Sequence, residues 1–312
     1  VSKGKAIMKA FVTGGNGFIG RELVRGLLRQ GSCDEVNIYS LGDQPCEGEE
    51  PDTRVKFLYG DVLDIGGMAR AMEGYDVVFH FAANPHVQLF LNDPHFLQGT
   101  TATYNVLTAM RLAGIQQIVF ASSSVVYGDT DSLDPIPEDA PLAPVSLYGA
   151  SKVAAEAMIR AFCRVYDFHA IILRLANIIG PNPTHGVLFN WRNALASNQK
   201  ILRVLGDGYQ EKSYLHVAEC VDAILWVLRC QPCQKGFIDA INIGNVDTIR
   251  LSEIAKMMVA KFGRPDTEII YAGGRAGWVG DVPKVFMDIS RLRAMGGRPM
   301  FNSRLAVDKS IR

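Results

Sequence analysis

Tyr148 and Lys152 form the pair whose residue types and spacing most directly suggest chemistry in this chain. They stand four residues apart in a segment with helical periodicity, and residues at that spacing share one face of a helix. A free phenol has a pKa of about 10 and is a poor base at neutral pH, but a nearby cation favours the phenolate and lowers that value. The pair could therefore accept and return a proton near pH 7. The same spacing also occurs by chance on solvated helix faces, so its meaning depends on its surroundings.

Three spaced glycines, Gly14, Gly17 and Gly20, lie between a predicted strand and a predicted helix near the start of the chain. Glycine permits a tight turn, and its missing side chain lets backbone amides approach a pyrophosphate. The helix that follows turns the positive end of its dipole toward the phosphates. Spaced glycines alone are a weak signal, but here the strand, loop and helix occur in the required order. This context favours a dinucleotide-binding loop over a plain turn.

The elements predicted around these residues alternate between short apolar runs and amphipathic stretches, as in a parallel sheet wrapped by helices. We predict strands at residues 10–13, 36–39, 55–59, 77–81, 118–121 and 170–175, with helices at 19–30, 94–113 and 147–166. Helices are also predicted at 218–228 and 251–262. The fold class is therefore α/β, a Rossmann doubly wound parallel sheet followed by a smaller C-terminal α/β substrate-binding region.

The boundary between these two regions is expected near Gly180-Pro181, where clusters of turn residues begin. We assign residues 8–180 to the cofactor-binding domain and 181–312 mainly to the substrate-binding region. Residues 238–243 could return to the main sheet as a strand. Residues 1–7 look like an extension that precedes Met8.

Composition excludes several classes of partner. Lys+Arg and Asp+Glu both number 32 among 312 residues, so no global field would attract nucleic acid or anionic lipid. No apolar run is long enough to span a bilayer, and we expect a cytoplasmic protein. The six cysteines do not suggest a disulfide framework, and Cys230 with Cys233 forms a lone C-x-x-C without a second pair. No metal site is therefore expected.

Several motifs in the same order resemble the extended branch of the short-chain dehydrogenase/reductase superfamily, which contains the NAD-dependent nucleotide-sugar epimerases and dehydratases. The G-x-x-G-x-x-G loop at residues 14–20, Gly60-Asp61-Val62 and Phe81-Ala82-Ala83 match its cofactor segments. The run of three serines at 122–124, followed by Val-Val-Tyr-Gly, matches its catalytic strand end, about 25 residues before Tyr148. The segments 174–181, 206–217 and 274–283 match its substrate half. The motifs look closest to those of UDP-glucose/UDP-galactose 4-epimerases.

This resemblance implies a role for each matching residue. Catalysis is expected from Ser123, Tyr148 and Lys152, with Ser122 and Ser124 as neighbours of the catalytic serine. NAD is expected to contact Gly14, Gly17, Phe18, Ile19, Gly20, Ser40, Asp61, Val62, Phe81, Ala82, Ala83, Tyr148 and Lys152. The substrate is expected to contact Ser123, Ser124, Tyr148, Asn177, Asn190, Lys212, Arg275 and Asp281, with Lys212 and Arg275 on a diphosphate and Asp281 on the uridine ribose.

Two positions depart from the family pattern. Ser40 stands at the end of the second strand, where an acidic residue usually binds the adenosine ribose. A serine can still hydrogen-bond a hydroxyl, and no arginine nearby would hold a 2′-phosphate, so NAD remains the expected cofactor. Gly99 replaces an asparagine that helps to position the active-site strands, which implies lower activity or compensation elsewhere.

The expected reaction is epimerisation at C4 of a UDP-hexose through a transient 4-keto intermediate. Dehydratases of this family place Asp-Glu directly after the catalytic hydroxyl residue, whereas this chain has Ser124 and Val125. Val285 falls at a position where a small residue leaves room for a 2-acetamido group, so N-acetylhexosamine substrates could also fit. The alternatives are a dehydrogenase or reductase of another keto-sugar or hydroxysteroid, and a non-catalytic NAD-binding sensor. By family habit, the helices at 94–113 and 147–166 would form a homodimer as a four-helix bundle.

Overall fold

The computed structural model describes residues 8–42, 52–84, 95–129, 133–197, 200–232 and 234–311, with side chains from residue 98 onward in the helix that begins at residue 95. The predicted N-terminal extension, the first residue of the helix predicted at 94–113, and Cys233 all lie outside these ranges. In the ranges described, no helix is both long and apolar enough to cross a membrane. Nor does any group of His, Cys, Asp and Glu side chains there have the arrangement of a metal site.

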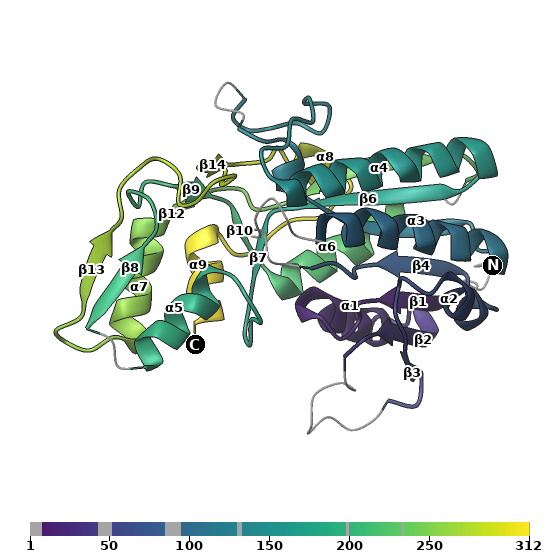
Figure 1. The fold of residues 1–312 in the computed structure, drawn as a ribbon, viewed down its shortest axis with the longest axis horizontal. Coiled ribbons are helices and arrows are strands. Elements are labelled where there is room, and N and C mark those ends of the chain that lie inside the picture. The colour runs from purple at the N-terminus through teal and green to yellow at the C-terminus, as the bar shows by residue number, and fades with distance from the viewer. Residues whose placement is uncertain are drawn as a thin grey trace.

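The larger part of the molecule is built on one seven-stranded sheet whose strands are all parallel (Figure 1). In spatial order its strands are β11 (Ile238–Ile243), β6 (His169–Leu175), β5 (Gln117–Ser123), β4 (Val77–His80), β1 (Met8–Thr13), β2 (Cys33–Ser40) and β3 (Val55–Tyr59). The chain moves outward from β1 to β3, then returns to β4 on the other side of β1. This reversal places the carboxyl ends of β1 and β4 at the switch point where doubly wound sheets bind their ligands.

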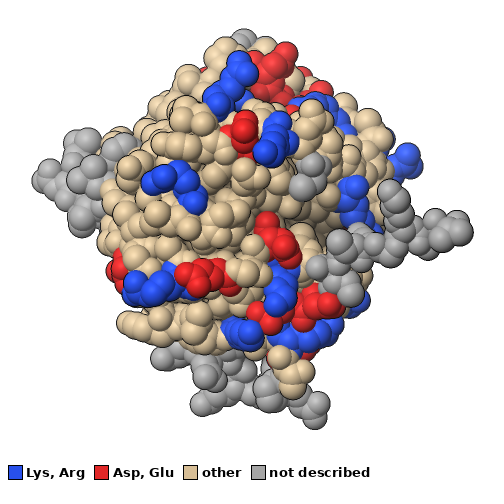
Figure 2. All heavy atoms as spheres, turned by 90° about the vertical axis from the view of Figure 1, so that its right-hand side faces the viewer, with Lys and Arg blue, Asp and Glu red and all other residues tan. Residues whose placement is uncertain are grey.

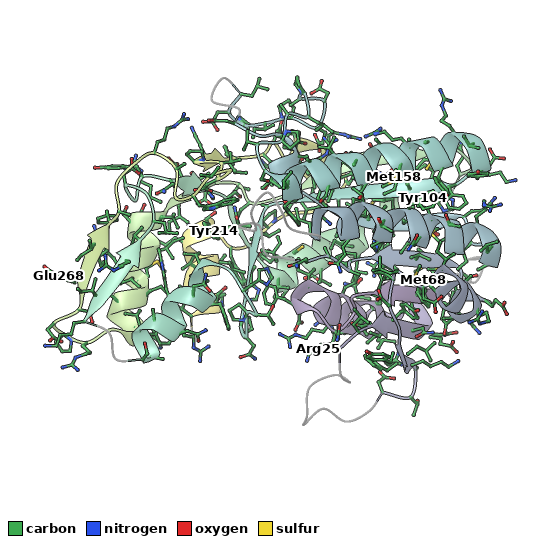
Figure 3. The ribbon with its side chains drawn as sticks, viewed as in Figure 1. Arg25, Met68, Tyr104, Met158, Tyr214 and Glu268 are labelled. Carbon is green, nitrogen blue, oxygen red and sulfur yellow. The ribbon has the colours of Figure 1, made fainter. Side chains whose placement is uncertain are left out.

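Helices cover both faces of the sheet and form two apolar cores with it. One core lies between the sheet and helices α1 (Phe18–Arg29), α6 (Val217–Cys230) and α8 (Ser290–Ala294). The other lies between the sheet and helices α2 (Ile65–Met72), α3 (His95–Ala113) and α4 (Leu147–Tyr166). Figure 3 labels Tyr104 on α3 and Met158 on α4, the two long helices that run side by side on this face. The predicted doubly wound α/β fold is confirmed.

The second lobe has its own small core and is built from short elements. Its helices are α5 (Val187–Ala196), α7 (Leu251–Phe262) and α9 (Ser303–Ser310). Its strands are β7 (Asn177–Ile179), β8 (Ile201–Val204), β9 (Glu211–Lys212), β10 (Tyr214–His216), β12 (Ile249–Arg250), β13 (Glu268–Tyr271) and β14 (Lys284–Val285). They pair as β10 with β7, as β12-β9-β14, and as β13 with β8. In Figure 1 this lobe lies beyond the end of β6 and contains the C-terminus.

Most predicted elements occur with ends shifted by a few residues, and the strand considered for residues 238–243 is present as β11 against β6. Helix α6 also packs on the main sheet, so α6 and β11 belong to the first region. Four helices were missed: α2, α5, α8 and α9. α2 follows a Gly-Asp segment and has two glycines in its first turn, and α5 lies where we expected only a substrate loop.

The face of the main lobe turned toward the viewer in Figure 2 carries basic and acidic side chains interspersed. The arrangement on this face agrees with the formal net charge of zero. It presents no single-sign patch of the kind that binds a polyanion.

Candidate active site

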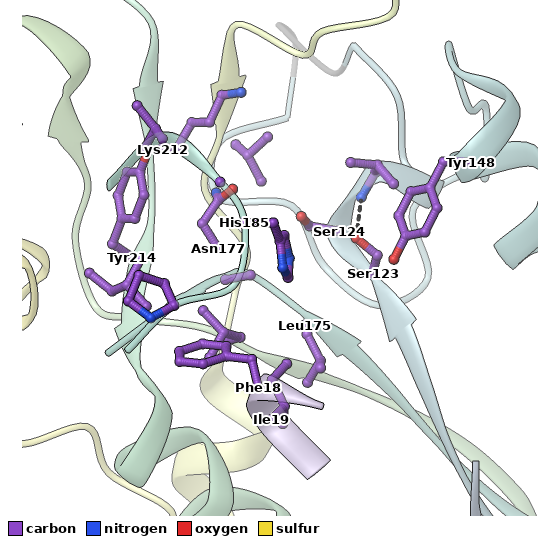
Figure 4. Close-up of a pocket in the computed structure, with 18 of the residues that line it drawn as sticks. Phe18, Ile19, Ser123, Ser124, Tyr148, Leu175, Asn177, His185, Lys212 and Tyr214 are labelled. Carbon is purple, nitrogen blue, oxygen red and sulfur yellow. Dashed lines mark hydrogen bonds between the residues drawn. The ribbon is translucent and has the colours of Figure 1, made fainter. Parts of the chain in front are cut away.

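A cleft of about 570 Å³ lies where the carboxyl ends of the main sheet meet the second lobe. Its walls include the glycine loop, the end of β5, the first turns of α4, the loop before α5, and residues of β9 and β14. Figure 4 shows Ser123 and Tyr148 on one side of this cleft, Lys212 and Tyr214 on the other, and Asn177 and His185 between them. The cleft therefore joins the predicted cofactor and substrate segments in one space.

Tyr148 and Lys152 enter the cleft from the first two turns of α4. Ser146 caps this helix by accepting a hydrogen bond from the Gly149 amide (3.1 Å), which starts the helix directly before Tyr148. Lys152 is buried and donates to the Ala121 carbonyl on β5 (2.8 Å). Its ammonium lies 5.7 Å from the centre of the Tyr148 ring. The predicted pair is thus assembled on one helix face and tied to the neighbouring strand.

Ser123 is the serine of the run that faces the Tyr148 phenol (Figure 4). It ends β5 and caps the short 3-10 turn Ser124–Val126, with the Val125 amide 3.5 Å from its Oγ. Ser122 lines the cleft but is buried, and its hydroxyl donates to Glu156. Ser124 also lines the cleft but is buried. The structure therefore places the Ser123 hydroxyl, of the three, beside the phenol.

The pKa of Tyr148 differs from the expectation that the neighbouring lysine lowers it. Burial raises the pKa of Tyr148 to about 12, and a hydrogen bond with Ser123 opposes this rise. Burial also lowers the pKa of Lys152 to about 8, which the carboxylate of Glu156 opposes. The protein groups alone thus favour a neutral phenol beside a lysine that titrates near physiological pH. Where Lys152 is protonated, its ammonium favours the phenolate, and a further positive charge in the cleft would lower the tyrosine pKa more.

The glycine loop has the close contacts that a dinucleotide-binding turn requires. A Cβ on Gly14 would lie 2.7 Å from the Ala82 amide nitrogen, and Gly14 has a φ of +71°. A Cβ on Gly20 would lie 2.2 Å from the Gly14 carbonyl oxygen. Helix α1 begins after Gly17 with no side chain capping its first amides, which leaves them available to phosphate oxygens. Together with Phe18 and Ile19, which also line the cleft, these residues fit NAD.

The other residues predicted to bind the cofactor lie around this loop. Phe81 and Ala83 line the cleft, and the Ala82 amide lies beneath the loop. Ser40, Asp61 and Val62 do not line it and lie at the ends of β2 and β3. The Ser40 hydroxyl donates to Asn16 of the glycine loop at 2.5 Å. Ser40 is therefore attached to the cofactor loop through Asn16, a contact that the sequence did not predict.

His80 is a buried residue near the site that sequence analysis missed. Its two ring nitrogens lie 2.8 Å from Thr13 Oγ1 and 3.2 Å from Thr103 Oγ1, so it links β1, β4 and α3 directly below the glycine loop. Burial lowers its pKa to about 3, helped by the positive charge of Lys152. The imidazole is therefore neutral, and each of its nitrogens has a hydroxyl partner.

Gly99, which stands where the family has an asparagine, lies on α3 close to Ser151 of α4. Thr103 donates to the Gly99 carbonyl (3.1 Å), and a Cβ on Gly99 would lie 3.4 Å from the Ser151 hydroxyl. Lys152 makes its direct bond to β5 in this region. The Thr103 bond thus lies within α3, whereas the Lys152 bond joins α4 to β5.

On the second wall, Asn177, Asn190, Lys212 and Asp281 all line the cleft. Lys212 donates to Asp281 at 2.6 Å, and the other Asp281 oxygen accepts from the Gly277 amide at 2.9 Å. Asn177 donates to the Ser213 carbonyl (3.2 Å). Asp281 was predicted as a ribose ligand, but in this structure it holds Lys212 and closes the 277–281 turn.

Arg275 lies apart from this group. Its side chain is 58% exposed and forms an ion pair with Asp129 at 3.4 Å, and it is not among the residues that line the cleft. Trp278, three residues later in the same loop, does line it, as does the buried Val285 of β14. Residues of the predicted loop thus line the cleft, but the sequence did not determine which of its side chains faces it.

Comparisons with known proteins agree with this geometry. Residues 10–244 match the model of the NAD dependent epimerase/dehydratase family. A crystal structure of a UDP-galactose 4-epimerase is 36% identical, with 97% of each chain covered and a TM-score of 0.85. A dTDP-glucose 4,6-dehydratase of Streptomyces venezuelae with NAD bound is 27% identical, with 98% of this chain and 96% of that chain covered and a TM-score of 0.85. The UDP-glucose 4-epimerase of Mycolicibacterium smegmatis is 28% identical over 97% of both chains.

Proposed function

Because this chain belongs to the NAD-dependent epimerase/dehydratase family, we propose that it interconverts UDP-glucose and UDP-galactose by epimerisation at C4. The choice of epimerisation over dehydration rests on the small number of carboxylates in the cleft. Among the described residues that line it, Asp281 is the one carboxylate, and it is bound to Lys212. A 4,6-dehydration needs further acid and base groups to remove the C5 proton and the C6 hydroxyl. C4 epimerisation needs only one proton acceptor that later returns the proton.

Tyr148 is that group in the proposal. NAD, when bound, supplies the chemistry of accepting a hydride from C4 and returning it. Tyr148 takes the proton from the O4 hydroxyl, with Ser123 hydrogen-bonded to the same oxygen, and returns it after the 4-keto sugar has turned over. Lys152 holds the nicotinamide-side ribose, and its charge stabilises the phenolate. Lys152 performs both roles from a buried position, where the bond to the Ala121 carbonyl holds its ammonium in place.

The second wall would hold the nucleotide while the sugar turns. Among the described residues of this wall, Lys212 is the cation that lines the cleft, and its positive charge suits a diphosphate. Asn177 and Asn190 offer amide donors beside it. The sugar must present both faces of C4 to one nicotinamide. It can do so only if the wall binds the nucleotide and diphosphate and leaves the hexose free to rotate about its phosphate linkage.

The proposal extends to N-acetylhexosamines and to a homodimer. Val285 is small and lines the cleft, which leaves room for a 2-acetamido group.

Helices α3 and α4 expose Tyr104, Leu112, Val165 and Tyr166, large apolar side chains that a four-helix bundle with a second copy would cover. Sedimentation at micromolar concentration would test the dimer, and a monomer would exclude it.

The proposed reaction is tested by incubating the purified protein with UDP-galactose and a catalytic amount of NAD. We expect UDP-glucose by chromatography with no net absorbance at the NADH band. Steady NADH accumulation would make the protein a dehydrogenase, and loss of water to a 4-keto-6-deoxy sugar would make it a dehydratase. NAD binding without turnover of any nucleotide sugar would make it a sensor. UDP-N-acetylglucosamine should compete with UDP-glucose, and failure to compete would exclude the acetamido substrates.

A further inference from the structure

Glu156 is a buried carboxylate on α4, one turn beyond Lys152, that lies behind the site and has no part in the proposed proton transfer. Its side chain is 1% exposed. It accepts hydrogen bonds from Ser122 Oγ (2.6 Å), Arg174 Nε (3.1 Å) and Arg174 NH2 (2.8 Å). Charge-assisted bonds of this kind, with Arg as a two-pronged donor, fix both distance and orientation.

Glu156 and its two partners belong to three different elements. Glu156 lies on α4, Ser122 on β5 and Arg174 on β6, and Ser122 is paired with Arg174 in the parallel ladder between the two strands. Tyr148 and Lys152 are on the same helix as Glu156, whereas Ser123 directly follows Ser122 at the end of β5. The carboxylate therefore connects the helix that carries the phenol and the ammonium to the strand that carries the hydroxyl.

The charges around Lys152 give this connection a second consequence. The groups that face its ammonium are Glu156 and Tyr148 on α4, neutral His80 on β4, the Phe120 ring and the Ala121 carbonyl on β5. Of these, Glu156 is the one formal negative charge, and it opposes the loss of the Lys152 proton that burial favours. Arg174 in turn balances Glu156, and its side chain is 3% exposed.

We propose that Glu156 is a positioning residue that, through Ser122 and Arg174, holds α4 against the ends of β5 and β6 and keeps the Lys152 ammonium charged beside Tyr148. The proposal deepens the proposed function and rests on it, because the residues positioned are those assigned to the proton transfer. It has a geometric effect, on the spacing of Ser123 and Tyr148, and an electrostatic one, on the charge of Lys152.

The first test is Glu156→Gln, which keeps the shape of the side chain and removes its charge. We expect kcat for UDP-galactose to fall about tenfold or more, while KM changes little, because the substrate wall is untouched. Activity that needs the Lys152 cation is lost as pH rises through the pKa of about 8. Without the carboxylate that pKa falls, so the basic limb of the kcat profile should move down by about one pH unit.

Tyr127→Phe is the matched control. The Tyr127 hydroxyl accepts from Arg174 NH1 (2.9 Å) and donates to Asn242 (2.7 Å), so its removal weakens the same buried network without touching Ser122 or Glu156. We expect a lower Tm with kcat and the basic limb unchanged. If Tyr127→Phe changes both as Glu156→Gln does, the network only stabilises the fold and the proposal is overturned. It is also overturned if Glu156→Gln leaves both unchanged.

A second variant covers the case in which Glu156→Gln does not fold because Arg174 is left as an unpaired buried cation. Glu156→Gln combined with Arg174→Met removes both charges and should show the same fall in kcat and the same shift. A direct measurement separates this proposal from the proposed function. The pKa of Lys152, followed by NMR of carbon-13-labelled lysine and assigned with Lys152→Met, should be lower in Glu156→Gln whatever the substrate is. An unchanged pKa overturns the proposal even if the protein proves to be an epimerase.

Discussion

The two walls of the cleft differ in the length of the elements that build them and in the bonds that hold their key side chains. On the main-sheet wall, Ser123 and Lys152 belong to a seven-residue strand and a twenty-residue helix. On the other wall, Lys212 and Val285 belong to strands of two residues. The reacting groups are thus held by long ladders and buried helices, whereas the groups facing the nucleotide are held by short pairings and turns.

The electrostatics of the walls differ in the same way. Lys152 bonds a backbone carbonyl, with its carboxylate partner one helical turn away. Lys212 is paired directly with Asp281, which also closes the loop that follows Arg275. We therefore expect the sheet to fix the reaction, and a few loop contacts to set substrate preference without disturbing the chemistry.

Among substitutions in the main-sheet wall, we expect Tyr148→Phe to lower activity most. Removing the hydroxyl removes the proton acceptor, and general acid–base groups contribute on the order of 10²–10⁴-fold. We expect kcat to fall by about 10³-fold with NAD affinity and Tm close to wild type. Product formation by chromatography and NAD binding by calorimetry would check this. Retention of more than about a tenth of the activity would remove Tyr148 from the proposed role.

Gly14→Ala should weaken NAD binding at the cofactor loop of the same wall. The new Cβ would meet the backbone at Ala82 and would need a positive φ, at a cost of about 1–3 kcal/mol. We expect NAD affinity to fall about 10- to 100-fold. Gly31→Ala is the control, because Gly31 also has a positive φ (+58°) but a Cβ there meets nothing within 4 Å. Equal losses of NAD affinity in both variants would contradict the contact with Ala82 as the cause.

Lys212→Met tests the second wall. Loss of a charge-assisted bond to the diphosphate costs about 1.5–3 kcal/mol, so KM for UDP-galactose should rise by about tenfold or more while kcat changes less. Arg275→Met is the matched control, since Arg275 is more than half exposed and lies outside the cleft. We expect its KM to stay near wild type. A larger effect at Arg275 than at Lys212 would show that the 274–281 loop rearranges when substrate binds.

The smallest effect concerns the pH dependence of stability. The folded protein holds His80 neutral, with its pKa lowered to about 3, whereas the unfolded chain takes up a proton below about 6.5. The contribution of His80 is therefore complete above about pH 6.5 and is lost progressively as pH falls toward 3. Thermal unfolding between pH 7 and pH 4 should show a falling Tm, and a smaller fall in His80→Gln. The same fall in both proteins would assign the acid sensitivity to other groups.

How well the sequence predicted an element depends on the length and apolar pattern of that element more than on its wall. The bounds of β3, α4 and α7 agree with the predicted ones, because each has a continuous apolar pattern with clear ends. The strands β9, β12 and β14 have two residues each and exist only through pairing with one another, which leaves no periodic signal. Helix α2 was missed because Gly66 and Gly67 in its first turn lower helix propensity, although Asp64 caps it.

The same limits apply to the site. Spacing predicted that Tyr148 and Lys152 share a face, and the structure brings Ser123 to them. Spacing could not predict that Arg275 turns away toward Asp129, because the direction of a side chain in a glycine-rich loop depends on contacts distant in sequence. Glu156 did have a signal, since it lies four residues after Lys152 on the same helix face.

In the proposed reaction, one buried acid–base pair lets a hydride leave C4 and return to it within the same cleft. The most direct test uses UDP-galactose labelled with deuterium at C4 and follows the label in UDP-glucose by NMR. The account predicts that deuterium remains at C4 of the product, with no exchange into water and no net reduced cofactor. Loss of the label to solvent, or its accumulation in free reduced cofactor, would contradict it.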